Sequence, residues 1–332
     1  MSISTSAKWL LLFITVCVIA IQHPQGKVIL NNITKDVPSI QQIAKNSETK
    51  APSLSKTKIT QKSRDLPTAS ELLQPNKDFE ANRIAATQRR TEQKAEYFVL
   101  HHSGMTFKNT KATLDKISRE LSAHFLVSGI GEIIQVFPTS YHAEGTLKSS
   151  RVWKVDQSGK FSDELAASPD AEFDRRTIQI ETNHAPQLKE APTTKKVASL
   201  GQLIAYLASK NKIPPTHLLS HTAVQPWGSS NYGPLDGRSN EPSGIMYKDW
   251  EGRKPDPLVV EPNVEALTKL ISIVRSYGVW LDGNYATMPD YKLAELILYI
   301  NLENAARNLD EKNPEIAQVY RTKAKNFKPA KL

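Results

Sequence analysis

The sequence contains one cysteine, Cys17, in 332 residues. A single thiol excludes a disulfide framework, and it also excludes a zinc site built from several thiolates. Apolar side chains make up 39% of the chain, whereas globular proteins usually contain about 45–50% when glycine is counted with them. We therefore expect part of the chain to lie outside a packed core.

The apolar run at residues 9–21 is too short to span a bilayer comfortably. It covers 13 residues and follows a short polar start that carries Lys8, whereas a spanning helix needs roughly 20. A positive start before a short apolar run is typical of a secretory signal. Residues 1–22 are thus predicted to be a signal peptide or, if uncleaved, a membrane anchor through residues 9–21. Both interpretations predict an exported protein, periplasmic or secreted.

Residues 23–95 are predicted to form a basic, largely disordered linker. They are rich in Lys, Ser, Thr, Gln and Asn and show no sustained apolar period. Such a segment buries too little to offset the entropy cost of ordering it. The pattern allows one short helix, over residues 78–93.

From residue 96 the pattern changes to strands interleaved with helices. Strands are predicted at 97–100, 124–127, 132–137, 177–181 and 217–221, and amphipathic helices at 110–121 and 193–210. This alternation indicates an α/β domain over residues 96–258. Helical periodicity then predicts a C-terminal region, 259–332, that packs on the domain through helices at 264–277, 289–307 and 314–325.

Histidines gather near the predicted strand ends. Five of the eight lie in such positions: His101, His102, His124, His217 and His221. Zinc chemistry without cysteine needs imidazole nitrogens and a carboxylate, with one coordination position open for water. The alternative is that these histidines are buried structural residues. We expect structural or supporting roles for His102 and His124, and no functional role for His217.

Six short motifs occur in the same order as in a known protein family. They are residues 99–104 (VLHHSG), 122–125 (SAHF), 141–145 (YHAEG), 178–181 (IQIE), 220–221 (SH) and 252–257 (GRKPDP). Together they resemble the zinc-dependent N-acetylmuramoyl-L-alanine amidases, whose fold is shared with phage amidase lysozymes and peptidoglycan recognition proteins. The resemblance covers about residues 96–258, roughly half of the chain.

The resemblance implies a fold, a metal site and a reaction. The fold would be a central mixed β-sheet flanked by helices. Glu181 would be the catalytic carboxylate, Lys254 a basic residue facing the reaction centre, and His142 a residue lining the substrate groove. The implied substrate is peptidoglycan or muropeptides, cut between N-acetylmuramic acid and L-alanine of the stem peptide. One Zn²⁺ would be held by three ligands: His101, His221 and Asp256.

Elementary chemistry agrees with these implied roles. Two neutral imidazoles and one carboxylate leave Zn²⁺ a net positive charge, which lowers the pKa of a bound water toward ~7. Glu181 could accept the proton of that water and pass it to the leaving amine. Lys254 could stabilise the oxyanion. The simpler alternatives are that Glu181 pairs with a surface lysine and that Lys254 is a solvated charge.

The connection between His221 and Lys254 is longer than is typical of the family. It spans 32 residues, 222–253, where typical members have a much shorter one, and it could form a groove wall or lid. Asp236 and Asp249 lie within it and are alternative third ligands. We prefer Asp256 because its surroundings match the family's pattern closely.

Two single positions also depart from the family. Ala123 stands where the phage enzymes carry a tyrosine, so that side chain's contribution is absent. Gln179 stands where glycine is common, and the sequence suggests no chemical consequence of this change.

The positive charge of the chain lies in its flanks. The 43 basic and 34 acidic side chains leave a net charge of +9, of which residues 1–95 carry +7 and residues 321–332 carry +5. A positive balance suggests an anionic partner, but the residues between these flanks are slightly negative. We therefore expect no nucleic-acid partner and instead expect the flanks to hold a near-neutral hydrolase against an anionic envelope surface.

Two other functions stay open at this stage. One is a non-catalytic peptidoglycan-binding module of the same fold, and the other is a zinc peptidase that acts on another peptide. A binding module would be expected to lose a ligand or the glutamate. This sequence keeps the whole set: His101, Glu181, His221 and Asp256.

Overall fold

The computed structural model describes residues 63–89, 92–103, 106–115, 122–143, 151–165, 173–183, 194–226, 262–311 and 313–329. The predicted signal peptide or anchor, the predicted linker up to residue 62 and residues 227–253 of the long connection lie outside these ranges. Among the described residues, no helix combines the length and apolar character that a membrane crossing requires.

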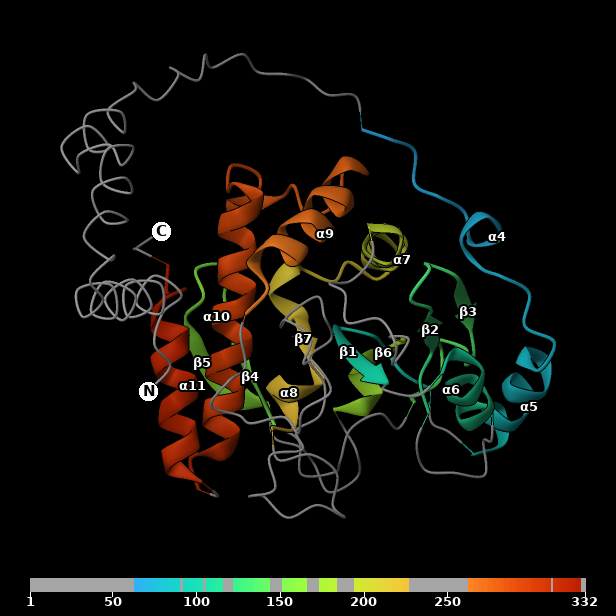
Figure 1. The fold of residues 1–332 in the computed structure, drawn as a ribbon, viewed down its shortest axis with the longest axis horizontal. Helices are drawn as coiled ribbons and strands as arrows, with labels where there is room; N and C mark the ends of the chain where they lie inside the picture. The colour runs from blue at the N-terminus through green and yellow to red at the C-terminus, as the bar shows by residue number, and fades with distance from the viewer. Residues whose placement is uncertain are drawn as a thin grey trace, which may run out of the picture. The chain divides into compact units, whose positions relative to one another are not determined.

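A five-stranded mixed sheet in the order β3-β2-β6-β1-β7 forms the centre of the fold (Figure 1). β1 (Tyr97–Ser103) is parallel to both of its neighbours, β6 (Thr177–Asn183) and β7 (Leu218–Ser220). β2 (Phe125–Val127) is parallel to β6, and β3 (Ile133–Gln135) is antiparallel to β2 at the far edge. The predicted α/β class with a central mixed sheet is confirmed.

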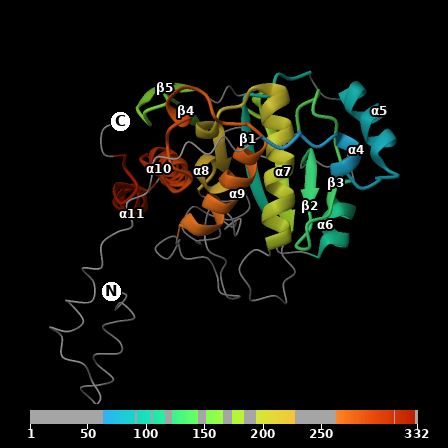
Figure 2. The same ribbon diagram turned by 90° about the horizontal axis from the view of Figure 1, so that it is seen from above.

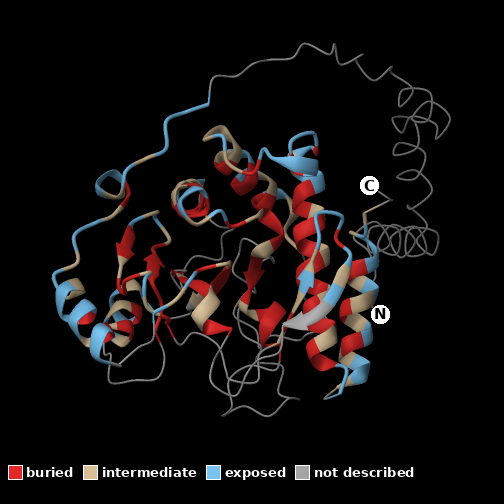
Figure 3. Ribbon diagram, turned by 180° about the vertical axis from the view of Figure 1, so that it is seen from behind, coloured by how far each residue is buried: buried red, intermediate tan, exposed pale blue. Residues whose placement is uncertain are grey.

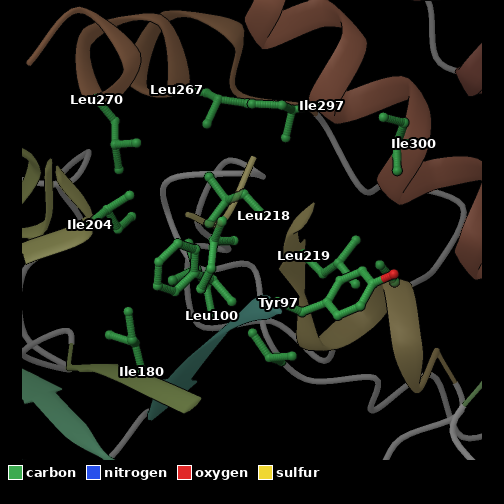
Figure 4. Close-up of a cluster of buried hydrophobic side chains, with 14 of the residues drawn as sticks. Tyr97, Leu100, Ile180, Ile204, Leu218, Leu219, Leu267, Leu270, Ile297 and Ile300 are labelled. Atoms are coloured by element: carbon green, nitrogen blue, oxygen red, sulfur yellow. The ribbon is translucent and has the colours of Figure 1, made fainter. Parts of the chain in front are cut away.

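The sheet contributes apolar side chains to the main core of the fold. Successive side chains of a strand point to opposite faces, and the register places Phe98 of β1 opposite Ile178 of β6 and Leu218 of β7. All three are fully buried. Figure 4 shows Leu218 among apolar side chains of the neighbouring helices, including Leu267.

Helices cover the sheet. α7 (Thr194–Asn211) and α9 (Val264–Ser276) lie side by side, as Figure 2 shows. α10 (Asp290–Leu309) packs against α11 (Pro314–Lys325) and against α8 (His221–Val224), which follows β7 directly. Their inner sides are buried (Figure 3). The three helices predicted after residue 258 are confirmed, each within a few residues of its predicted bounds.

A small hairpin was not predicted from the sequence. β4 (Val152–Val155) and β5 (Phe161–Leu165) form a separate two-stranded sheet. The guanidinium of Arg307, on α10, lies 4.5 Å from the ring centre of Phe161. These strands are short and carry polar residues, so they show no long alternating pattern from which the hairpin could be predicted.

Folded structure begins before residue 95, where the predicted linker was to end. α4 (Ala69–Leu72) and α5 (Phe79–Arg89) are both formed, and α5 falls within the helix predicted at 78–93. The backbone N–H of Gln74 donates to the carbonyl of Ile133 on β3 over 2.7 Å. The side chain of Asn82 donates to the carbonyl of Val136 over 2.9 Å. These polar contacts hold the segment to the sheet edge, and apolar periodicity in a sequence does not reveal contacts of this kind.

Helix α6 (Phe107–Leu114) begins three residues before the helix predicted at 110–121. The side chain of Thr106 accepts a hydrogen bond from the backbone N–H of Asn109 over 3.3 Å and so starts the helix earlier. Leu114 packs with Leu126 and Ile134 in a second apolar cluster. Residues 116–121 lie outside the described ranges.

Candidate active site

The parallel strands bring three of the predicted site residues to one end of the sheet. His101 lies near the end of β1, directly opposite Glu181 of β6 in the register. His221 begins α8 immediately after β7. Because β1 lies between β6 and β7 and runs parallel to both, the ends that carry these residues are adjacent.

The two imidazoles lie next to each other. The ring centres of His101 and His221 are 4.8 Å apart, with their planes inclined by 41°. His101 is buried and His221 is half-buried. The Ser220 side chain accepts a hydrogen bond from the backbone N–H of Ala223 over 3.2 Å, which starts α8 and fixes where His221 leaves the strand.

Each of these imidazoles has its Nε2 atom next to a glutamine oxygen. Nε2 of His101 bonds to Oε1 of Gln179, and Nε2 of His221 bonds to Oε1 of Gln225 over 3.0 Å. An amide oxygen can only accept, so each imidazole donates from Nε2. In a neutral ring the hydrogen then lies on Nε2, and Nδ1 carries the lone pair that a metal would bind.

This donor set fits Zn²⁺, which binds neutral imidazole nitrogens together with carboxylate oxygen. The third predicted ligand, Asp256, lies outside the described residues, as do the alternatives Asp236 and Asp249. Within the described ranges, no group of three or more His, Cys, Asp or Glu side chains is arranged to hold a metal ion. The three-ligand set therefore stays a prediction.

Two further predicted site residues are not placed against this histidine pair. Lys254 lies outside the described residues. His142 is described and buried, and its charge bears on the pKa of His124. Its predicted position in the substrate groove stays a prediction.

His124 has the surroundings of a structural residue. Its Nδ1 accepts a hydrogen bond from the backbone N–H of Gln179 over 2.9 Å, and its Nε2 lies 2.9 Å from the carbonyl of Tyr141. Complete burial lowers the pKa of His124 to about 4, so the ring stays neutral. These contacts agree with the supporting role expected for this residue.

His217 lies at the start of β7 and away from the imidazole pair. Its ring stacks on Tyr97 with centres 4.1 Å apart, and its Nδ1 lies 2.9 Å from the carbonyl of Glu96. Burial lowers the pKa of His217. The packing of this ring supports no role in the reaction.

The residues that surround His101 were not predicted from the sequence. Gln179 was noted as a departure without consequence, yet its side chain contacts His101, Asp174 and Thr177. The available signal was the polar alternation of β6, in which residues 177, 179, 181 and 183 share one face. A central strand with one polar face indicates a buried polar network beneath a site.

The fold and the site define an α/β protein in which two imidazoles and a carboxylate lie together where parallel strands end. The family model for N-acetylmuramoyl-L-alanine amidases matches residues 91–257, half of the chain. The chain therefore belongs to the N-acetylmuramoyl-L-alanine amidase family, and this makes it an enzyme of the peptidoglycan amidase class. No curated protein sequence matches the chain.

Several solved structures share similarity with the chain. The PlyG catalytic domain is 16% identical with a TM-score of 0.31, over 49% of this chain and 81% of that one. The amidase LysC from Clostridium intestinale URNW is 19% identical with a TM-score of 0.28, over 40% and 73%. AmiD from E. coli, solved with an anhydro-N-acetylmuramic acid peptide substrate, is 15% identical with a TM-score of 0.31, over 68% and 93%. Likenesses this distant carry no weight for the details of the site.

Proposed function

We propose that this chain is an exported Zn²⁺-dependent hydrolase that cleaves the amide between N-acetylmuramic acid and L-alanine of the stem peptide. The observation that supports it is the pairing of His101 with His221 beside Glu181 at adjacent strand ends. We propose His101, His221 and Asp256 as the ligands of one ion. Zn²⁺ held there would supply a Lewis acid that activates water and polarises the amide carbonyl.

The residues of the chain would then carry the proton transfers. The carboxylate of Glu181 would accept a proton from the attacking water and deliver it to the nitrogen of the departing L-alanine. Glu181 is half-buried near the end of β6, which holds it beside His101 of β1. Lys254 would stabilise the negative charge that develops on the carbonyl oxygen, and His142 would line the substrate groove.

Digestion of purified peptidoglycan tests the reaction. The protein should release new L-alanine amino ends, and removal of zinc by a chelator should stop this release. Glu181→Gln should keep the fold and bind one zinc ion per chain but lose at least about 100-fold in turnover, because general acid–base catalysis contributes that much or more. The matched control is Glu132→Gln, a change of an exposed carboxylate in the β2–β3 turn, which should leave turnover unchanged.

Each competing function predicts a different result in this digestion. A non-catalytic binding module would sediment with peptidoglycan and release no amino ends. A zinc peptidase would release amino ends other than L-alanine. Turnover that survives both chelation and Glu181→Gln would contradict the proposed mechanism.

The flanks suggest where the enzyme works. We propose export through residues 1–22, with the basic flanks held against an anionic envelope surface and muropeptides or intact peptidoglycan as the substrate. The charge distribution supports this, because residues 1–95 and 321–332 together carry more positive charge than the whole chain. Expression of the full chain with and without residues 1–22, followed by fractionation, tests export directly: both forms staying in the cytoplasm would contradict it.

A further inference from the structure

The side chain of Gln179 lies in a buried, hydrogen-bonded polar cluster beneath the site. Gln179 is fully buried on the central strand β6. Its Nε2 lies 3.0 Å from Oδ1 of Asp174 and 2.6 Å from Oγ1 of Thr177, while its Oε1 bonds to Nε2 of His101. All four side chains are nine-tenths or more buried.

The orientation of this amide follows from the hydrogen-bonding capacity of its neighbours. The carboxylate of Asp174 can only accept. The hydroxyl of Thr177 donates to the backbone carbonyl of Asp174 over 3.1 Å, so its oxygen accepts from the amide. Both hydrogens of the Gln179 amide are therefore committed to Asp174 and Thr177, and its oxygen has to face His101.

This orientation decides which nitrogen of His101 carries the hydrogen. The amide oxygen accepts from Nε2, so Nε2–H is the favoured form of the neutral ring and Nδ1 keeps its lone pair. Hydrogen-bond partners of this kind orient metal-binding imidazoles, and their loss typically weakens metal affinity about 10–100-fold.

We propose that Gln179, anchored by Asp174 and Thr177, is a positioning residue that holds His101 in its Nε2–H form and so presents Nδ1 to Zn²⁺. This rests on the proposed function as far as the metal is concerned. A glycine at residue 179, which the resemblance makes the usual choice, has no side chain to make these contacts. In this chain, the side chain of Gln179 on β6 would thus support the proposed zinc ligand His101.

Two measurements on the full-length protein test the proposal. Nitrogen-15 NMR of the metal-free protein at about pH 8, where histidine is ordinarily neutral, reports the tautomer of each imidazole; His101→Asn assigns the His101 signals. Zinc affinity is measured by competition with a chromophoric chelator. Wild type should show His101 in the Nε2–H form. Gln179→Met should shift His101 toward a mixture of tautomers and weaken zinc binding about 10–100-fold.

The control variant is Gln202→Met. Gln202, on α7, donates to the hydroxyl of Tyr277 over 3.2 Å and takes no part in the cluster beneath the site. This change should leave both the His101 tautomer and the zinc affinity as in wild type.

Thr177→Val keeps the proposal testable if Gln179→Met does not fold. It removes the hydroxyl that accepts from the amide, so it should change both readouts in the same direction by a smaller amount. Unchanged tautomer and unchanged zinc affinity in the folded variant would overturn the proposal. If wild type binds no zinc, the proposed function fails, whereas the tautomer in the metal-free protein still decides whether Gln179 positions His101.

Discussion

At the scale of single residues, Gln179 supports two histidines in different ways. Its backbone N–H donates to Nδ1 of His124, and its side-chain oxygen accepts from Nε2 of His101. The first bond holds a structural ring, because the other nitrogen of His124 lies against the carbonyl of Tyr141. The second bond favours the hydrogen of His101 on Nε2, so Nδ1 carries the lone pair that a metal would bind. Gln179 therefore bonds to a structural histidine through its backbone and to a proposed metal ligand through its side chain.

The burial of His124 predicts a pH dependence of stability. Its pKa is lowered from 6.5 to about 4 in the folded state. Between these values the unfolded chain binds the extra proton and the folded chain does not, so the free energy of unfolding falls as the pH falls below 6.5. The slope should approach about 1.4 kcal/mol per pH unit, with a total loss of roughly 3 kcal/mol by pH 4.

Urea unfolding of the metal-free protein between pH 4.5 and 8 measures this effect. His124→Asn keeps an acceptor for the Gln179 N–H but does not titrate, so its stability curve should be flatter below pH 6.5 and parallel to wild type above pH 7. His217 also has a lowered pKa from burial, so the variant should retain part of the slope. Curves that run parallel over the whole range would show that His124 does not cause it.

The sequence could predict which candidate site residues lie together, but not the residues that support them. His101, Glu181 and His221 stand in strand-end motifs, and the structure brings all three to one end of the sheet. The contribution of Gln179 depends on contacts with Asp174 and Thr177, which follow from how the short helical turn before β6 folds back on the strand. A pattern of residue types cannot show that geometry, although the polar alternation of β6 indicated a buried polar face.

At the scale of elements, α10 closes one edge of the sheet. β7 is an edge strand, and its outer backbone groups need partners. Oδ1 of Asn301 accepts from the N–H of Ser220 over 2.7 Å, and Nδ2 of Asn301 donates to the carbonyl of Leu218 over 3.0 Å. A single side-chain amide thus bonds to the strand as a neighbouring strand would. His221 follows immediately, so this contact also fixes where the strand ends.

Replacing Asn301 by alanine should destabilise the protein strongly. Asn301→Ala leaves the buried N–H of Ser220 and the carbonyl of Leu218 without this partner, and each such group costs roughly 1–3 kcal/mol. We expect the free energy of unfolding to drop by about 2–4 kcal/mol in urea titration, with an unchanged m-value. Asn284→Ala, at an exposed position, is the control and should change stability little. A loss below about 0.5 kcal/mol for Asn301→Ala would mean that water or backbone movement satisfies the edge.

Periodicity predicted α10 well but did not predict this contact. The sequence shows an apolar face at helical spacing, and the observed helix runs from Asp290 to Leu309. The asparagines 301, 304 and 308 are also buried on it, at spacings that put them on one side. Asn308 bonds to the backbone of Arg151 and Ala223. Asparagines at helical spacing within an apolar pattern were thus the feature of the sequence that indicated a helix bonded to the backbone of neighbouring segments.

At the scale of the whole molecule, both edges of the sheet are closed by segments outside residues 91–257. On the β3 side, the backbone N–H of Gln74 donates to Ile133, and the side chain of Asn76 donates to the carbonyl of Gln135 over 2.9 Å. On the β7 side, α10 makes the contacts of Asn301. The part that matches the family model therefore has two strand edges that the flanking segments cover. Uncovered edges are open to pairing with other chains.

The apolar core crosses the same boundaries. Leu267, Leu270 and Val274 of α9 are fully buried in the same cluster as Phe98 and Leu218 of the sheet. Leu72 of α4 joins this cluster from the N-terminal side. The described residues accordingly belong to a single compact unit, Lys62–Leu332. The described residues on either side of residues 91–257 therefore fold together with the sheet, although the sequence suggested a domain boundary on each side.

Truncation at different boundaries should separate these contributions. A chain of residues 62–332 should unfold cooperatively with the same Tm as residues 23–332, because it retains both edge covers and the whole core. A chain of residues 91–257 should fail to unfold cooperatively and should aggregate, because it loses both edge covers and the apolar side chains of α9 and α10. Calorimetry and light scattering at matched concentrations measure the two outcomes. If residues 91–257 folded as a stable monomer, the edges would have to be satisfied within the family-matching part itself, and the contacts of Gln74 and Asn301 would be dispensable.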